Sequence, residues 1–167
     1  MAPEALFAEV GPGDNAIDLA CVEVRGRLYG LEVAQIREIV RSQEVTPLPK
    51  APPLIEGVID LRGSVVPVVD LCRALHGEPS AERATTRIAV LEVDGMVIGL
   101  RVEAAVDVLS VDAASVQEPP ALATQAGYDA IRAVIRRPEG SPVLVLSTEH
   151  LLEGVYRSGR GGAGGEA

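Results

Sequence analysis

Short valine-rich runs alternate with turn-forming residues along most of the chain, and this pattern predicts an all-β protein. The dipeptides Arg25-Gly26, Arg62-Gly63 and Asp94-Gly95 are typical of two-residue β-hairpin turns. The runs that we expect to form strands are residues 17–24, 27–33, 57–61, 64–70, 88–93, 96–102, 130–136 and 143–146. Many short strands at this spacing indicate barrels or sandwiches. Brief helices are expected at residues 34–40, 71–75, 102–107 and 148–153.

An internal repeat divides the chain, because residues 22–40 align with residues 91–109 at an offset of 69 (91 − 22). The identical positions in the two segments are Glu23 and Glu92, Val24 and Val93, Gly26 and Gly95, Gly30 and Gly99, Leu31 and Leu100, and Val33 and Val102. Each unit then continues into a second hairpin and a short helix. The chain is therefore expected to hold two copies of one small β-barrel, over residues 17–77 and 85–153, packed through a shared apolar interface. Two alternatives stay open: chain ends exchanged between the barrels, or a chance likeness of two valine-rich hairpins.

The two ends of the chain differ in composition from its middle. Proline and glycine interrupt residues 1–15, which we expect to form a flexible leader. Glycine dominates residues 158–167, and such a segment cannot offset its ordering entropy by burying side chains, so a disordered tail is expected there. A single domain over residues 16–157 remains, and it is long enough to fold without a disulfide or a structural metal.

Charge and cysteine content narrow the possible partners and the compartment. The chain carries 15 basic and 24 acidic residues, a net charge of −9 that is the wrong sign for binding nucleic acid. Its longest strongly apolar run, residues 65–69, is far shorter than the roughly 20 residues that cross a bilayer, so no membrane insertion is expected. Cys21 and Cys72 do not form a disulfide framework, and residues 1–15 lack the pattern of a secretory signal. A cytoplasmic protein is expected.

The motifs of catalysis and cofactor binding are weak or absent in the sequence. Cys72 and His76 have the spacing of one helix face, but no second pair completes a metal site. Neither His76 nor His150 has a sequence context typical of a general base, and Ser64 lacks the G-x-S-x-G elbow. The one formal G-x-G-x-x-G, residues 159–164, lies in the glycine-rich tail. We therefore expect no catalytic residue, no metal and no cofactor: the protein is predicted not to be an enzyme.

A group of motifs between Tyr29 and Leu71 resembles a known family. The matching residues are Tyr29-Gly30, Ile36 to Ile39, Pro47-Leu48-Pro49, Pro52, Gly57-Val58-Ile59, Leu61-Arg62-Gly63 and Val66-Pro67-Val68-Val69-Asp70-Leu71. In this order and spacing they resemble the CheW family of chemotaxis coupling proteins. The likeness continues through residues 96–110 and covers about residues 17–153. Because 167 residues cannot hold the additional domains of related kinases, the resemblance implies the stand-alone adaptor.

The resemblance implies two five-stranded, SH3-like barrels related by a pseudo-twofold axis, with a few short helices. It also implies a scaffold that couples chemoreceptors, the methyl-accepting chemotaxis proteins, to a CheA-type histidine kinase. The family binds the helical hairpin tip of a receptor in a groove between the barrels, which is a helix-in-groove contact. It binds the regulatory domain of the kinase at barrel edges. Self-association in receptor arrays is left open, as is the pathway served: swimming, gliding, twitching or development.

Six residues are candidates for binding these partners. They are Ile36, Glu38, Ile39, Gly57, Arg62 and Val108. Ile39 and Val108 are repeat partners, so a pseudo-twofold axis would bring them to equivalent places on the two barrels. Gly57 is interpreted as a position where backbone or a partner approaches closely, and the alternative is a plain glycine at the start of a strand. The competing interpretation for each apolar residue is ordinary core packing.

Arg62 stands out because a surface hairpin turn more often carries Asn, Asp or Gly at this position. Its guanidinium offers five donors in a rigid fork, and Glu38 is the expected carboxylate partner. The competing interpretation is an exposed arginine of little energetic importance.

A function of another class also remains open: a β-barrel that binds a small ligand, or a barrel enzyme with an unrecognised site.

Overall fold

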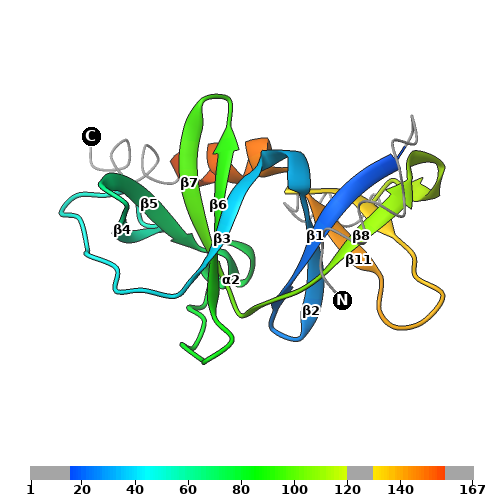
Figure 1. Cartoon of the computed structure of the whole chain (residues 1–167), viewed down its shortest axis with the longest axis horizontal. Helices are drawn as coiled ribbons and strands as arrows, with labels where there is room; N and C mark the ends of the chain where they lie inside the picture. Colours follow the sequence, from blue (N-terminus) through cyan, green and yellow to red (C-terminus); the bar gives the residue numbers. More distant parts are fainter. Residues whose placement is uncertain (1–15, 120–129, 157–167) are drawn as a thin grey trace.

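Strands dominate the structure, a computed structural model that describes residues 16–119 and 130–156. Two sheets lie side by side, and the helices over residues 71–76 and 148–156 pack between them (Figure 1). The all-β class is therefore confirmed, as is the pair of similar barrels. The leader expected over residues 1–15 and the tail expected over residues 158–167 lie outside the described residues.

Each sheet forms one barrel. The five-stranded barrel has the strand order β3-β6-β7-β5-β4, and the six-stranded barrel has the order β8-β1-β2-β11-β10-β9. The strands of the first are β3 (Ile36–Arg41), β4 (Ile55–Leu61), β5 (Ser64–Asp70), β6 (Arg87–Val93) and β7 (Met96–Val102). Those of the second are β1 (Ala16–Val24), β2 (Arg27–Glu32), β8 (Ala104–Asp112), β9 (Val116–Gln117), β10 (Ile131–Ile135) and β11 (Val143–Leu146). The helical elements are η1 (Val33–Gln35), α2 (Leu71–His76), η2 (Ala113–Ser115) and a helix over residues 148–156.

The repeat is visible in strand pairing as well as in sequence. β8, β1, β2, β11 and β10 follow one another in one sheet as their repeat counterparts β3, β6, β7, β5 and β4 do in the other. A bulge leaves Arg37 unpaired in β3, because Ile36 pairs with Leu91 and Glu38 pairs with the next residue of β6, Val90. The equivalent bulge leaves Val106 unpaired in β8, 69 residues later (106 − 37). Two bulges at one repeat position rule out a chance likeness between unrelated hairpins.

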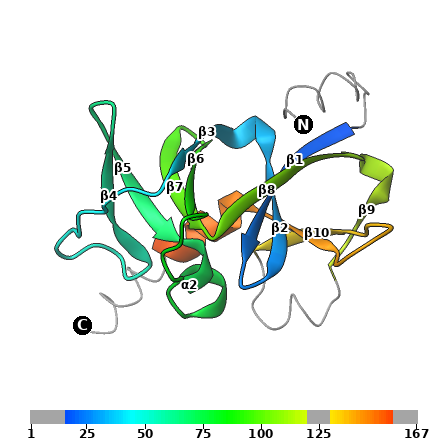
Figure 2. The same cartoon turned by 60° about the horizontal axis from the view of Figure 1, so that its bottom comes forward.

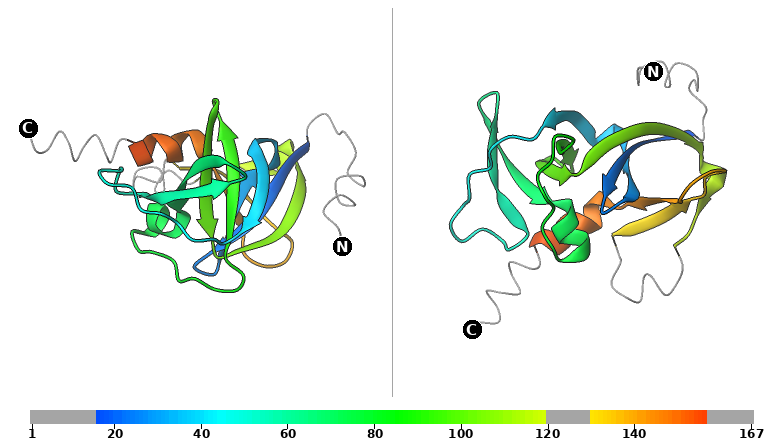
Figure 3. Two further views of the ribbon diagram at one scale, coloured as in Figure 1. Left: turned by 60° about the vertical axis from the view of Figure 1, so that its left-hand side comes forward. Right: turned by 90° about the horizontal axis from the view of Figure 1, so that it is seen from below.

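The chain segments assigned to the two barrels, residues 17–77 and 85–153, were wrong, because the barrels exchange strands. β1 and β2 join the strands of the second repeat, whereas β6 and β7 join β3, β4 and β5 of the first. The short connections between β7 and β8 and between β2 and β3 explain this exchange. Only Glu103 separates β7 from β8, and a single residue is too short for a hairpin turn, so β8 runs on into the other sheet (Figure 3). The turn η1 carries the chain across in the same way between β2 and β3.

Two of the four expected helices are strands. Residues 34–40 and 102–107 were predicted to be helical, but they contain β3 and the start of β8. Half-buried and exposed positions alternate along β3, which is the period of a strand. Pairing with β6 and β1 stabilises these segments as strands. The other two expected helices, at residues 71–75 and 148–153, are confirmed.

Three apolar clusters fill the fold. One lies inside each barrel, and the third, which we call the shared core, joins them. The shared core takes Val22, Val24, Tyr29 and Leu31 from the six-stranded barrel, Leu91, Ile98 and Leu100 from the five-stranded barrel, Leu71 from α2, and Leu151, Leu152 and Val155 from the helix over residues 148–156. Cys21 and Cys72 are buried, free thiols.

The segment that follows the exchanged strand closes each barrel. After β3, Thr46 pairs with Val58 of β4 through two backbone hydrogen bonds of 2.8 Å. After β8, the equivalent segment is β9, which pairs with β10. This short strand is why the second sheet has six strands instead of the expected five.

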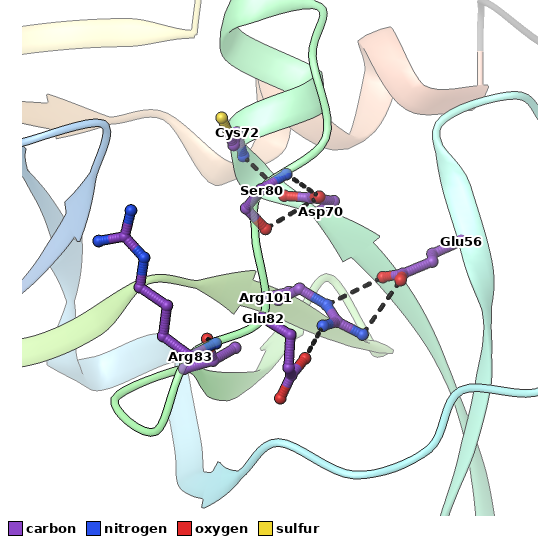
Figure 4. A network of polar contacts seen from close by, with 8 residues as sticks. Glu56, Asp70, Cys72, Ser80, Glu82, Arg83 and Arg101 are labelled. Carbon is purple, nitrogen blue, oxygen red and sulfur yellow. Dashed lines mark hydrogen bonds and ion pairs between the residues drawn. The ribbon is translucent and has the colours of Figure 1, made fainter.

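Buried polar contacts fix the turns around the five-stranded barrel (Figure 4). The Asp70 carboxylate accepts hydrogen bonds from the backbone N–H groups of Cys72 at 3.0 Å and Ser80 at 2.8 Å. Asp70 thereby caps α2 and holds the segment that follows it. Arg101 of β7 binds Glu56 of β4 at 3.0 Å and also Glu82.

In the described part of the chain, no helix is long and apolar enough to cross a membrane.

We predict that the repeat partners Gly99 and Gly30 differ in their tolerance of alanine. A Cβ on Gly99 would lie 2.8 Å from Cγ2 of the buried Ile88, whereas a Cβ on Gly30 would lie 3.2 Å from Cγ1 of Val143. Both neighbours are β-branched and cannot easily swing aside, so the shorter of the two contacts costs more. Gly99→Ala should therefore lower the free energy of unfolding by about 1–3 kcal/mol, and Gly30→Ala by less. Urea unfolding of both variants measures this. Equal losses would contradict the packing described.

A second prediction concerns alkaline pH. Burial, followed by the charge of Asp107, raises the pKa of Cys21 from 9.0 to about 11. The folded protein therefore keeps this proton when the unfolded chain has lost it, and the resulting stabilisation is complete below pH 9 and lost as the pH rises toward 11. Between these values the free energy of unfolding of the wild type should fall on the order of 2 kcal/mol further than that of Cys21→Ala. Parallel curves in urea unfolding would contradict it.

Candidate functional site

The exchanged edge strands β3 and β8 carry four of the six predicted partner-binding residues. Ile36, Glu38 and Ile39 lie on β3, and Val108 lies on β8. Ile39 pairs with Ala89 and Val108 pairs with Ala20, which is itself the repeat partner of Ala89. The expected equivalence of Ile39 and Val108 is therefore confirmed in the strand register.

Strand alternation shows where these two side chains point. Val40 packs against the interior of the five-stranded barrel, so its neighbour Ile39 points out of that barrel. Leu109 packs inside the six-stranded barrel, so Val108 points outward in the same way. Ile39 is 38% exposed and Val108 is half-buried. Ile36, by contrast, packs against the shared core, as the core-packing interpretation expects.

Arg62 and Glu38 form the ion pair that the sequence predicts. Nη1 of Arg62 donates to Oε2 of Glu38 at 3.0 Å, and Nη2 donates to Oε1. Arg62 and Gly63 have φ values of 53° and 87° and form the turn of the β4–β5 hairpin. The Asp60 carboxylate stabilises this turn by accepting a hydrogen bond from the N–H of Gly63 at 2.8 Å. The pair links β3 to the β4–β5 hairpin, the two opposite edges of the five-stranded barrel. Glu38 lies on a strand and not on the expected helix, but the contact is the same.

The Arg62 side chain is 74% exposed and that of Glu38 is 27% exposed. An ion pair as open as this contributes little to folding stability, usually about 0–1 kcal/mol. Its guanidinium keeps donors that face solvent, since only two of its nitrogens bond to Glu38. The arrangement therefore presents an oriented cation at the turn of the β4–β5 hairpin, on the opposite face of β3 from Ile39.

Gly57 lies where two backbone segments meet. A Cβ at this position would stand 2.2 Å from the carbonyl oxygen of Thr46 and 2.8 Å from Cγ1 of Val45. The expected close approach is confirmed, and the approaching backbone belongs to this chain. Gly57 thus allows the Thr46–Val58 bridge that closes the barrel beside the β4–β5 hairpin.

Four large apolar side chains that are exposed in the described residues were not among the predicted site residues. Val65 on the β4–β5 hairpin is 69% exposed, Val106 on the β8 bulge 52%, Leu48 45% and Met96 41%. The β4–β5 hairpin projects from the body of the protein, as Figures 2 and 3 show. Val65 pairs with Asp60, which lies two residues before Arg62. The only indication in the sequence was that Val65 continues an apolar run up to a polar turn.

The two residues considered for a metal site have other contacts. His76 on α2 meets the hydroxyl of Tyr29 at 3.1 Å through Nε2. Burial, then Arg25 and Arg27, lowers the pKa of His76, and burial, then Asp70, raises the pKa of Cys72. Both groups are therefore held neutral near pH 7. Over residues 16–119 and 130–156, no group of three or more His, Cys, Asp or Glu side chains is placed to hold a metal.

A surface hollow of about 750 Å³ lies between the β6–β7 turn and the helix over residues 148–156. Its lining includes Met96 and Leu152 together with the carboxylates Asp94, Glu149 and Glu153. None of the six predicted partner-binding residues lines it. The hollow is therefore separate from the outward faces of β3 and β8.

Comparison with known proteins gives a consistent picture. The family model for the CheW-like domain matches residues 18–155. The chemotaxis protein CheW of Treponema pallidum is 28% identical over 143 residues, which is 83% of each chain. The CheW of Bacillus subtilis is 33% identical over 115 residues, 69% of this chain and 72% of its own.

A solved structure shares the fold. The crystal structure of the scaffolding protein TtCheW from Thermoanaerobacter tengcongensis superposes with a TM-score of 0.72 at 26% identity, over 81% of this chain and 86% of that one. The family model spans both barrels and the edge strands that carry the predicted residues. This chain therefore belongs to the CheW family.

Proposed function

We propose that this protein is a cytoplasmic, non-catalytic scaffold that couples chemoreceptors to a CheA-type histidine kinase. Membership of the CheW family over residues 18–155 supports the role. The observation that carries the proposal is the geometry of β3: Ile39 points out of its barrel, and the other face of the same strand carries the Arg62–Glu38 pair. Such a surface binds by apolar contact and oriented charge.

The receptor contact is assigned to the outward faces of β3 and β8. A chemoreceptor tip is a helical hairpin, and its apolar stripe would pack on Ile39 and Val108, with Val106 extending the apolar face. Glu38 and Arg62 lie on the opposite face of β3, at the turn of the β4–β5 hairpin, and would contribute charge-assisted hydrogen bonds to the kinase contact at that edge. The pseudo-twofold relation of Ile39 and Val108 suits a partner whose two helices run antiparallel.

The kinase contact is assigned to a barrel edge. The β4–β5 hairpin projects into solvent and carries Val65, the most exposed large apolar side chain of the described residues. A regulatory domain with a CheW-like fold would pack an apolar patch of its own against this hairpin. Receptor and kinase would then occupy different parts of the molecule, and self-association in an array would use the remaining barrel ends.

Arg62→Ala tests the assignment of the charged pair. The variant should fold with a free energy of unfolding within about 1 kcal/mol of the wild type, because the ion pair is exposed. Its affinity for a receptor signalling fragment or for a kinase regulatory domain should fall about ten- to a hundredfold, since a charge-assisted contact desolvated by a partner contributes roughly 1.5–3 kcal/mol. Isothermal titration of each partner from the same genome measures both affinities.

Arg25→Ala is the matched control for this experiment. Arg25 also precedes a glycine in a hairpin turn, with φ 52°, and it also forms an exposed ion pair, with Glu78 at 3.3 Å. It lies in the other barrel, at the β1–β2 turn, so its removal should leave both affinities unchanged. Unchanged affinities in a folded Arg62→Ala would remove Arg62 from the binding surface. A wild-type protein that binds neither partner would refute the scaffold itself.

A further inference from the structure

Gln35 occupies one of the two places where the chain crosses between the barrels. It is the last residue of η1, which links β2 of the six-stranded barrel to β3 of the five-stranded barrel. Its side-chain amide makes two hydrogen bonds with residues more than a hundred positions away. Oε1 accepts from Oγ1 of Thr148 at 2.6 Å, and Nε2 donates to Oε1 of Glu149 at 2.9 Å.

Both contacts lie on the first turn of the helix over residues 148–156. Thr148 is only 2% exposed, and Leu151, Leu152 and Val155 of the same helix are buried in the shared core. The helix is therefore a fixed support. Since the next residue after Gln35 is the first of β3, the amide ties the start of this strand to that support.

The second crossing is held in a different way. Glu103, between β7 and β8, donates its backbone N–H to the carbonyl of Glu23 at 2.9 Å and accepts the N–H of Arg25 with its carboxylate at 3.0 Å. The repeat partner of Gln35 is Ala104, whose methyl group forms no hydrogen bond. The amide anchor is thus specific to the strand that carries Glu38 and Ile39.

We propose that Gln35 is a positioning residue for partner binding: by joining η1 to Thr148 and Glu149, it sets the placement of β3 and so the direction of Glu38 and Ile39. This inference rests on the proposed scaffold function. Gln35 need not touch a partner. Loss of its amide would let the start of β3 shift against the C-terminal helix while the strand stayed paired with β6.

Four variants separate this role from general destabilisation. Gln35→Ala removes both hydrogen bonds, and Thr148→Val removes one hydroxyl at nearly constant shape. Gln35→Glu places a carboxylate against that of Glu149, and the double variant Gln35→Glu with Glu149→Gln restores a donor and an acceptor with their residues exchanged. Ser80→Ala is the control, because it removes one part-buried hydroxyl contact, 3.0 Å from Asp70, away from β3.

The full-length variants are titrated with a chemoreceptor hairpin fragment from the same genome, and amide hydrogen exchange is followed in β3 and β4. Gln35→Ala and Thr148→Val should weaken binding about three- to tenfold and speed exchange in β3 by a similar factor, while β4 stays unchanged. Gln35→Glu should be weaker still, and the double variant should recover to within about twofold of the wild type. Ser80→Ala should bind as the wild type does.

Two outcomes overturn the inference on its own. If the wild type binds and the Gln35 variants bind equally well, Gln35 does not position the surface, whatever the exchange rates are. If the variants weaken binding but exchange rises equally in β3 and β4, the loss is one of global stability. If the wild type binds no fragment, the proposed function fails first, and the inference that rests on it fails with it.

Discussion

The apolar core shared by the two barrels is the interaction on which the rest of the structure depends. Residues of β1, β2, β6 and β7 meet there, and both α2 and the helix over residues 148–156 pack into it. Because β1 and β2 join strands of the second repeat while β6 and β7 join strands of the first, neither barrel is built from one repeat alone. Each repeat therefore depends on the other for its sheet and for its core, and the two barrels are expected to unfold as one unit. The same exchange places β3 and β8 each at the end of its sheet, where side chains can reach partners.

The repeat keeps contacts even where it changes residues. In the five-stranded barrel, Arg101 of β7 binds Glu56 at the bulge of β4. In the six-stranded barrel, Glu32, which is the repeat partner of Arg101, binds Arg132 at the bulge of β10. The charges have changed places while the geometry has stayed the same. What the fold requires at this position is an ion pair between a central strand and a bulged strand, in either orientation. Among the described residues, the Arg62–Glu38 pair has no counterpart in the six-stranded barrel, which distinguishes a contact of the surface from a contact of the fold.

Local patterns in the sequence predicted much of this arrangement. Hairpins at Arg25-Gly26, Arg62-Gly63 and Asp94-Gly95 followed from their turn residues, and the repeat followed from glycines in register. The Glu38–Arg62 contact could be predicted because hairpin turns more often carry Asn, Asp or Gly, so an arginine in the turn indicates that its guanidinium binds a nearby carboxylate. The strand exchange could not, since nothing in residues 33–35 indicates which sheet the chain enters next. The strands β3 and β8 were missed for the same cause: long-range pairing with β6 and β1 decides their structure. Gln35 contacts Thr148 and Glu149, which lie 113 and 114 positions further along the chain, and no local pattern indicates such contacts.

A scaffold differs from a simple binding protein in holding two partners at once. Sedimentation velocity of a receptor hairpin fragment mixed with the regulatory domain of the kinase, with and without this protein, measures whether it does so. We expect the two partners to sediment together in one ternary species only when the protein is present, because the β3–β8 face and the β4–β5 hairpin are separate surfaces. Binary complexes alone, with each partner displacing the other as its concentration rises, would contradict it.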